Sequence, residues 1–291
     1  MPHRQKIYAK NLRIKDNVLL LQHTKKATTV DQMIITAVQT DIVWNEPTVN
    51  QNDAERLMAS APHSDVYVLP EMWATGFATE PQGMAEDEQT CSESGSLAWM
   101  KRMAAETDAA ICGSLSIRTA EGEYANRMYF VRPDGSFDFY DKRHLFGCGG
   151  EDRFYTPGKR RVVVEFRGVR FLLLVCYDLR FPVWSRNNDD YDAIILAANW
   201  PTPRQEVWTT LLRARALENQ CCVVGVNRVG KDPMCPYNGG SIIVNSYGKT
   251  VADAGQTASA ATAEIDFEKQ NSFRRSFPVL KDRESFCIEK L

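Results

Sequence analysis

The strongest constraint on how this chain can fold is the segment VVVEFRGVRFLLLVCYDLRFP at residues 162–182. Two apolar runs flank an Arg167-Gly168 turn, and the second run, Phe171–Val175, is five consecutive apolar residues long. Such a run is typical of a strand that is covered on both faces. Cys176 follows directly, at the carboxyl end of the strand, where ligands usually bind in open sheets. Taken alone, this cysteine is explained better by ordinary core packing.

Two other predicted strands also end on a reactive side chain. The segment DVYVLPEMW at 65–73 is a short strand that is followed by Glu71. The segment SFDFYDKRHLF at 136–146 alternates in the manner of a strand and leads to Lys142. A surface role is the simpler explanation for either residue by itself. Together with Cys176, however, a carboxylate and an ammonium are the components of an activated nucleophile.

The composition is that of an ordinary globular protein, with 291 residues, 44% hydrophobic and 25% charged, and a net charge of -2. This balance leaves no excess charge for binding nucleic acid or a membrane surface. No apolar run approaches the ~20 residues that a membrane-spanning helix needs. Eight cysteines without a C-x-x-C pair predict reduced thiols in the cytoplasm, and the four scattered histidines indicate no metal site.

Residues 1–32 differ from the rest because they carry seven basic and two acidic residues, whereas the whole chain is slightly acidic. Their apolar patch, Val18–Leu21, is too short for a signal peptide, and the stretch lacks the serine content of an organelle transit peptide. An alternating strand, MIITAVQTDIVW, begins at Met33. We therefore expect residues 1–32 to be a disordered N-terminal extension and residues 33–291 to form one folded domain.

Helical and extended patterns alternate along this domain, without a dividing linker or a short repeat. Helices that alternate with pairs of strands predict two sheets with helices outside. The predicted helices are 48–60, 90–107, 203–220 and a short one at the end, and the predicted strands are 34–39, 66–69, 110–118, 124–131, 136–140, 171–175, 192–199, 222–227, 241–245, 250–254 and 261–266.

Two of these segments allow a more detailed interpretation. In the predicted helix 203–220, the apolar residues assigned to one buried face are Trp208, Leu211, Leu212 and Leu217. The glycine-rich segment 147–150 lacks the Lys-Ser/Thr ending and the following helix of a phosphate-binding loop. We expect it to be a mobile loop beside Lys142.

The three reactive side chains suit acyl transfer through a thioester. A cysteine attacks carbonyl carbon as the thiolate, and the ammonium of Lys142 can lower the thiol pKa from ~8.5 into the range ~3.5–7.5. The same ammonium, together with the backbone N–H of Tyr177, can stabilise the oxyanion of a tetrahedral intermediate. Glu71 can accept the thiol proton and pass it to the leaving nitrogen, and water then completes the hydrolysis.

A cysteine-histidine pair is the alternative means of activating the thiol. Of the two histidines in the domain, His63 and His144, the second lies two residues after Lys142. It would share a face with Lys142 on an extended segment, so strand geometry leaves it open as the base. We rank it second to Glu71 because of a family resemblance.

Several segments in the right order resemble the carbon-nitrogen hydrolase (nitrilase) superfamily. They are LPEMWATGF around Glu71, YDKRHLF around Lys142, LLLVCYDLRFPVWSRN around Cys176, ANWP at 198–201, RARALENQ and GGSIIVNSYG. The resemblance covers the chain from about Met33 to its end. Nitrilases themselves tend to carry Cys-Trp-Glu at the nucleophile, whereas this chain has Cys-Tyr-Asp. It is therefore similar to the amidase branch, and closest to the omega-amidases.

The resemblance implies a four-layer α-β-β-α sandwich of two mixed sheets with helices outside. It implies that Glu71 is the general base, Lys142 the oxyanion stabiliser, Cys176 the nucleophile and Glu151 a supporting second glutamate. For an omega-amidase it implies cleavage of the amide C–N bond of 2-oxoglutaramate or 2-oxosuccinamate, without a cofactor or metal. It also implies a homodimer or larger homo-oligomer, assembled through helix faces and the C-terminal segment 277–291.

A small anionic amide needs a cation for its free carboxylate, preferably a guanidinium that binds in bidentate fashion. Arg180, four residues after the predicted nucleophile, is the first candidate and Arg204 the second, while a surface ion pair is the simpler explanation for either. Aromatic residues could form the apolar walls of the pocket, although they are as often plain core. The candidates are Phe77, Phe146 and Trp200.

Two other functions remain open on the sequence. The chain could be an amidase or N-carbamoyl hydrolase for another small substrate. The cation that faces the nucleophile would distinguish this function from that of an omega-amidase. The chain could also be a non-catalytic, nitrilase-like interaction protein in which the three residues are only inherited. Covalent labelling of Cys176 by an electrophile would argue against the second of these.

We predict that deleting residues 1–32 leaves a soluble and active protein, because the folded pattern begins at Met33. Solubility and activity of the deleted chain, measured beside the full-length chain, test this expectation. Insoluble protein would show that the extension contributes to folding.

Overall fold

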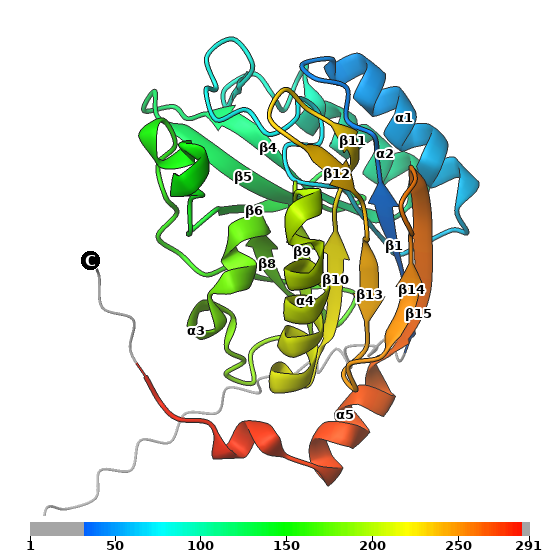
Figure 1. Cartoon of the computed structure of the whole chain (residues 1–291). Coiled ribbons are helices and arrows are strands. Elements are labelled where there is room, and N and C mark those ends of the chain that lie inside the picture. Colours follow the sequence, from blue (N-terminus) through cyan, green and yellow to red (C-terminus); the bar gives the residue numbers. More distant parts are fainter. Residues whose placement is uncertain (1–31, 287–291) are drawn as a thin grey trace, which may run out of the picture.

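Two sheets packed face to face form the centre of the molecule, with helices on both outer faces (Figure 1). The computed structural model describes residues 32–286. The predicted N-terminal extension, apart from Gln32, lies outside the described residues, and so does the end of the predicted C-terminal segment. The predicted four-layer α-β-β-α sandwich is confirmed.

The first sheet has seven strands in the order β15-β1-β2-β4-β5-β6, with β3 paired to β4. Strands β1, β2 and β4 are parallel neighbours, and the other long strands pair antiparallel, so the sheet is mixed. The strands are β1 (Gln32–Gln39), β2 (Val66–Val68), β3 (Glu86–Asp87), β4 (Ala110–Arg118), β5 (Tyr124–Val131), β6 (Phe137–Asp141) and β15 (Ser259–Asp266).

The second sheet has six strands in the order β14-β13-β10-β9-β8-β7, with parallel pairing along β8, β9 and β10. A separate two-stranded hairpin of β11 and β12 follows β10. The strands are β7 (Val163–Phe166), β8 (Val169–Val175), β9 (Ala193–Ala197), β10 (Cys222–Val226), β11 (Val229–Lys231), β12 (Pro236–Asn238), β13 (Ile242–Val244) and β14 (Thr250–Asp253).

Two helices cover the first sheet, and one long helix covers the second (Figure 1). The helices α1 (Pro47–Ser60) and α2 (Ser96–Thr107) lie on the first sheet, and α4 (Gln205–Asn219) lies on the second. The remaining helices are the short α3 (Pro182–Ser185) and α5 (Phe267–Ser276), which follows β15. Among residues 32–286 we find no helix with the length and apolar character needed to cross a membrane.

The alternation of side chains along the strands separates two hydrophobic cores. In β2, Val66 and Val68 pack between the two sheets, whereas Tyr67 packs on the opposite face with α1 and α2. The same alternation divides Ile111 from its neighbour Cys112 in β4. By contrast, β8 is buried on both faces, as its unbroken apolar run predicts.

Helix α2 begins at Ser96, six residues later than the predicted start at residue 90. The residues before it form turns closed by backbone bonds such as Ser94 N–H to the Thr90 carbonyl, 3.1 Å. The side chain of Glu86 then accepts the Ser96 N–H at 2.9 Å, which satisfies a free donor of the first helical turn. Hydrophobic periodicity could not show this boundary, because the capping carboxylate comes from ten residues upstream.

Helix α4 corrects the predicted apolar face. Trp208 and Leu212 are buried and Leu211 packs partly against the core, but Leu217 is 54% exposed. Leu217 lies nine residues after Trp208, which is about half a turn around the helix at ~3.6 residues per turn. The prediction that Leu217 shares the buried face is therefore wrong, and an apolar side chain is left on the surface.

Candidate active site

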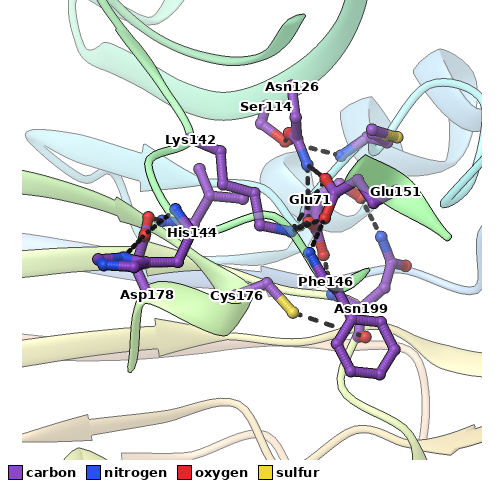
Figure 2. Close-up of polar contacts among 12 residues, drawn as sticks. Glu71, Ser114, Asn126, Lys142, His144, Phe146, Glu151, Cys176, Asp178 and Asn199 are labelled. Carbon is purple, nitrogen blue, oxygen red and sulfur yellow. Dashed lines mark hydrogen bonds and ion pairs between the residues drawn. The ribbon is translucent and has the colours of Figure 1, made fainter. Parts of the chain in front are cut away.

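The ends of three strands bring Glu71, Lys142 and Cys176 together, as the sequence predicts (Figure 2). Glu71 follows β2 and Lys142 follows β6, both in the first sheet, whereas Cys176 follows β8 in the second. Lys142 Nζ donates to Glu71 Oε1 at 2.8 Å, and both side chains are fully buried. The Cys176 thiol is close enough for both charges to act on its pKa.

The ammonium of Lys142 lies between two carboxylates. Besides Glu71, it donates to both oxygens of Glu151, at 2.8 and 3.1 Å, and Glu151 is also fully buried. Burial alone would lower the pKa of Lys142, but the charges of Glu151 and Glu71 outweigh burial and raise it. The lysine is therefore held as a cation, and Glu151, the predicted supporting glutamate, is in direct contact with it.

The glycine-rich segment before Glu151 is not an irregular loop. It forms two successive turns of 3-10 helix, η1 (Gly147–Gly149) and η2 (Glu151–Arg153). The backbone N–H of Phe146 donates to Glu151 Oε2 at 2.6 Å. The segment thus delivers a buried carboxylate to Lys142 and a phenyl ring to the adjacent cavity.

Two asparagines orient the carboxylates, and the sequence reasoning did not single out either. Asn126 Nδ2 donates to Glu71 Oε1 at 2.8 Å and to Glu151 Oε1 at 2.9 Å. The backbone N–H of Asn199 donates to Glu71 Oε2 at 2.9 Å, and its side chain donates to the Glu71 carbonyl at 2.6 Å. The motif ANWP contains Asn199 and could have indicated it, whereas Asn126 is one polar residue within an ordinary strand.

Cys176 begins the 3-10 helix η3 (Cys176–Arg180) in a left-handed backbone conformation, with φ of 45°. Residues other than glycine rarely adopt this conformation, and it tends to occur at functional sites. The chain turns sharply at the end of β8, and the sulfur lies 3.8 Å from the carbonyl oxygen of Asn199. Only 9% of the residue is exposed.

The electrostatics of Cys176 differ from the sequence expectation. Burial and the Glu71 carboxylate raise the pKa of the thiol well above its ordinary value, and the opposing effect of Lys142 is smaller. Lys142 lowers the thiol pKa, as the sequence predicts, but burial and the Glu71 carboxylate outweigh this effect. A neutral thiol needs a base when it attacks, and Glu71 is the carboxylate with the largest effect on the pKa of Cys176.

A cavity of about 280 Å³ opens onto Cys176. All five predicted substrate-binding residues line it: Phe77, Phe146, Trp200, Arg180 and Arg204. The hairpin of β11 and β12 supplies a wall that the sequence did not predict, through Met234, Cys235 and Tyr237. Short strands around a turn carry little periodicity, which explains why this wall was missed.

The two arginines of the cavity lie over aromatic rings and not against acids. The guanidinium of Arg180 is 5.0 Å from the ring centre of Trp200, and that of Arg204 is 5.2 Å from the ring centre of Phe146. Among residues 32–286, neither side chain forms an ion pair. Both are therefore open to an anionic ligand in this cavity.

His144 is engaged elsewhere. Its Nδ1 is 2.8 Å from Asp178 Oδ1, and its ring stacks on Phe181 with 3.7 Å between ring centres. It does not line the cavity, and in Figure 2 its ring points to Asp178. The described part of the chain also contains no group of three or more His, Cys, Asp or Glu side chains that could hold a metal ion.

Comparison with known proteins identifies the family of this chain. Residues 34–275 match the family described as carbon-nitrogen hydrolase. The chain belongs to this family. An omega-amidase YafV from Yersinia enterocolitica is 44% identical over 257 residues, which are 87% of this chain and 98% of that protein. A 2-oxoglutaramate amidase from Bacillus subtilis is 35% identical, over 85% of this chain and 96% of that protein.

A solved structure shares the whole architecture. It is a CN-hydrolase superfamily protein from Xanthomonas campestris, described with an arsenic adduct in its active site. It superposes with a TM-score of 0.84 at 37% identity, over 89% of this chain and 99% of that one. This chain therefore shares the fold of that CN-hydrolase superfamily protein.

The raised thiol pKa predicts how Cys176 reacts with iodoacetamide. In the resting protein, we expect alkylation of Cys176 to reach half its maximal rate at a pH above the ordinary cysteine value of ~8.5. Substitution of Glu71 by Gln removes a negative charge that raises the pKa, so the midpoint should move to lower pH. Mass spectrometry of the Cys176 peptide measures both profiles.

A chain with Cys176→Ala serves as the control, because it shows which part of the alkylation belongs to Cys176. A wild-type midpoint well below ~8.5 would mean that Cys176 rests as a thiolate paired with Lys142, contrary to this interpretation.

Proposed function

We propose that this protein hydrolyses the amide C–N bond of a small omega-amido 2-oxo acid, 2-oxoglutaramate or 2-oxosuccinamate, to the 2-oxo acid and ammonia. The observation that carries the proposal is that Cys176, Arg180 and Arg204 all line the same cavity. The Cys176 thiol can attack an amide carbon, and the arginines can bind the free carboxylate of the substrate. The relatives named omega-amidase and 2-oxoglutaramate amidase support the same substrate class.

The first half of the proposed reaction forms a thioester. Cys176 Sγ attacks the amide carbon while Glu71 takes the thiol proton, so a carbon-sulfur bond forms and the carbonyl electrons move to oxygen. Lys142 Nζ and the backbone N–H of Tyr177 stabilise this oxyanion. Tyr177 lies in the first turn of η3, where backbone N–H groups have no partner within the helix. Glu71 then protonates the nitrogen, the C–N bond breaks and ammonia leaves.

The second half releases the 2-oxo acid. Glu71, again a carboxylate, takes a proton from water as the water oxygen attacks the thioester carbon. The same donors stabilise the second oxyanion, and its collapse returns the proton to the Cys176 sulfur. Glu151 and Asn126 keep Lys142 and Glu71 in place through both halves, because Glu151 accepts from Lys142 and Asn126 donates to both carboxylates.

The carboxylate of the substrate is proposed to bind Arg180, with Arg204 as the second candidate. Arg180 belongs to η3, the same short helix that begins with Cys176, so its position relative to the sulfur is constrained by one turn of backbone. The rings of Phe77, Phe146 and Trp200 exclude water around the scissile amide, which strengthens these charge interactions.

We predict that wild-type protein releases ammonia from 2-oxoglutaramate and that Cys176→Ala abolishes this release. Arg180→Ala should raise KM for 2-oxoglutaramate roughly 10- to 100-fold, since a hydrogen bond to a charged group contributes ~1.5–3 kcal/mol. Activity on a neutral aliphatic amide should change little. Steady-state ammonia assays on both substrates measure these values. The panel also contains 2-oxosuccinamate, glutamine, asparagine, a nitrile and an N-carbamoyl amino acid.

Arg213→Ala is the matched control, because Arg213 lies on the exposed face of α4 and does not line the cavity. Equal loss on anionic and neutral amides would contradict the role of Arg180 in binding the carboxylate. Preference for an N-carbamoyl or simple neutral amide would favour the alternative amidase activities over the proposed substrate.

We further propose that the protein works in the cytoplasm as a homodimer. The cysteines at 91, 112, 148, 176, 221, 222 and 235 are all free thiols, which fits a reducing compartment.

Three exposed apolar side chains lie on adjoining segments: Val183 in α3, Leu217 at the end of α4 and Phe277 after α5. Their exposed fractions are 53%, 54% and 60%, and hydrogen bonds from Arg186 to Glu218 and from Gln220 to Phe277 join these segments.

Leu217→Asp should therefore convert a dimer to a monomer, because it buries a charge in the apolar contact. Sedimentation velocity measures the assembly, with Val43→Asp as the control at an exposed valine before α1. A monomeric wild-type protein, or a variant whose assembly is unchanged, would contradict this interface.

A further inference from the structure

Asp178 is a buried carboxylate that the proposed reaction does not use. The residue is completely inaccessible to solvent and does not line the cavity. Both of its oxygens are nevertheless fully engaged. Oδ2 accepts the backbone N–H of Val175 at 2.9 Å and the hydroxyl of Tyr140 at 2.8 Å. Oδ1 accepts the backbone N–H of His144 at 3.0 Å and lies 2.8 Å from His144 Nδ1 (Figure 2).

The positions of these donors are informative. Val175 directly precedes the nucleophile, while Tyr140 and His144 lie two residues before and two residues after Lys142. Tyr140 belongs to β6 of the first sheet, and Val175 ends β8 of the second. A single carboxylate therefore joins the backbone at Cys176 to both flanks of Lys142, across the interface between the two sheets.

The donors are themselves held in place. The Tyr140 hydroxyl also accepts the N–H of Arg143 and the indole N–H of Trp184, each at 3.1 Å. Because the carboxylate can only accept, His144 Nδ1 must carry the proton in this contact. The His144 ring is fixed further by its stacking on Phe181, which directly follows η3.

Cys176 needs such support because of its backbone. Its φ of 45° is a conformation that a cysteine keeps only when the surrounding structure determines it. The bond from Val175 N–H to Asp178 Oδ2 closes the turn directly over Cys176. Loss of this bond would allow the sulfur to relax away from Glu71 and Lys142.

We propose that Asp178 is a positioning residue, which sets the distance between Cys176 and Lys142 by binding Val175, Tyr140 and His144 at once. It acts through these groups and does not touch the substrate. The rate measurement for this inference rests on the proposed function. The alkylation of Cys176 does not, so a failure of the proposed substrate and a failure of this inference can be told apart.

The principal test is Asp178→Asn. An asparagine has one acceptor oxygen, so its amide N–H groups must face one of the two pairs of donors. We expect kcat on 2-oxoglutaramate to fall at least ~10-fold with KM changed less than about twofold, since the geometry of the attack is disturbed and the cavity is not. The pH midpoint for iodoacetamide alkylation of Cys176 should move from its raised value toward the ordinary ~8.5.

Thermal unfolding is measured on the same samples, with Asp138→Asn in β6 as the control at an exposed aspartate. A lower Tm with an unchanged kcat per folded molecule and an unchanged alkylation midpoint would overturn the inference, since Asp178 would then be only structural. A wild type without amidase activity would refute the substrate, and the alkylation profiles would still decide the role of Asp178.

Two milder variants keep the inference testable if Asp178→Asn does not fold. Tyr140→Phe removes one donor to Oδ2, and His144→Ala removes one donor to Oδ1, without placing a new donor against the carboxylate. Each should lower kcat a few-fold with little change in KM, and each should move the alkylation midpoint in the same direction. Wild-type kcat and midpoint in both variants would overturn the inference.

Discussion

The ammonium of Lys142, buried between the carboxylates of Glu71 and Glu151, is the interaction on which the rest of the site depends. All three side chains are fully buried, and a buried charge is tolerated only when it is paired and hydrogen-bonded. Removal of Lys142 would leave the two buried carboxylates without a cation, and removal of either carboxylate would leave the ammonium with a single anionic partner. The ends of β2 and β6 and the turns before Glu151 must therefore meet at this point for the chain to fold as it does.

This cluster also explains the state of the nucleophile. The burial that makes the charge cluster strong also raises the pKa of the Cys176 thiol, and the nearby Glu71 adds to that effect. In the proposed mechanism, the proton therefore passes from the thiol to Glu71 as the substrate carbonyl is attacked. A resting thiol also has the advantage of being less open to oxidation than a thiolate.

The two sheets contribute different parts of the chemistry. The first sheet supplies the proposed base, Glu71, and the cation of Lys142, and the second supplies the proposed nucleophile, Cys176, together with Asn199 and the helix η3 with Arg180. The cavity lies where these ends meet, and its arginines face a space large enough for a small substrate. Activity should therefore depend on contacts that fix one sheet relative to the other, such as those of Asp178, in addition to the reactive groups.

Sequence could predict the reactive residues because each follows a recognisable strand and lies in a motif of its family. It also predicted Glu151 and the five residues of the cavity wall from the resemblance and from ligand chemistry. It could not predict the raised pKa of Cys176, because burial depends on the whole fold. It also missed Asn126 and the β11–β12 wall, because a single polar residue and a short hairpin carry too little local signal. It placed Leu217 on the wrong face of its helix.

The central claim is that Cys176 forms a covalent thioester during turnover, beside a glutamate and a lysine that do not. Rapid quenching of wild-type protein with 2-oxoglutaramate, followed by mass spectrometry of the Cys176 peptide, tests it most directly. The account predicts an acyl adduct on Cys176 that forms as ammonia is released and disappears when substrate is exhausted. Sustained ammonia release without any adduct, together with continued ammonia release by the Cys176→Ala variant, would contradict the account.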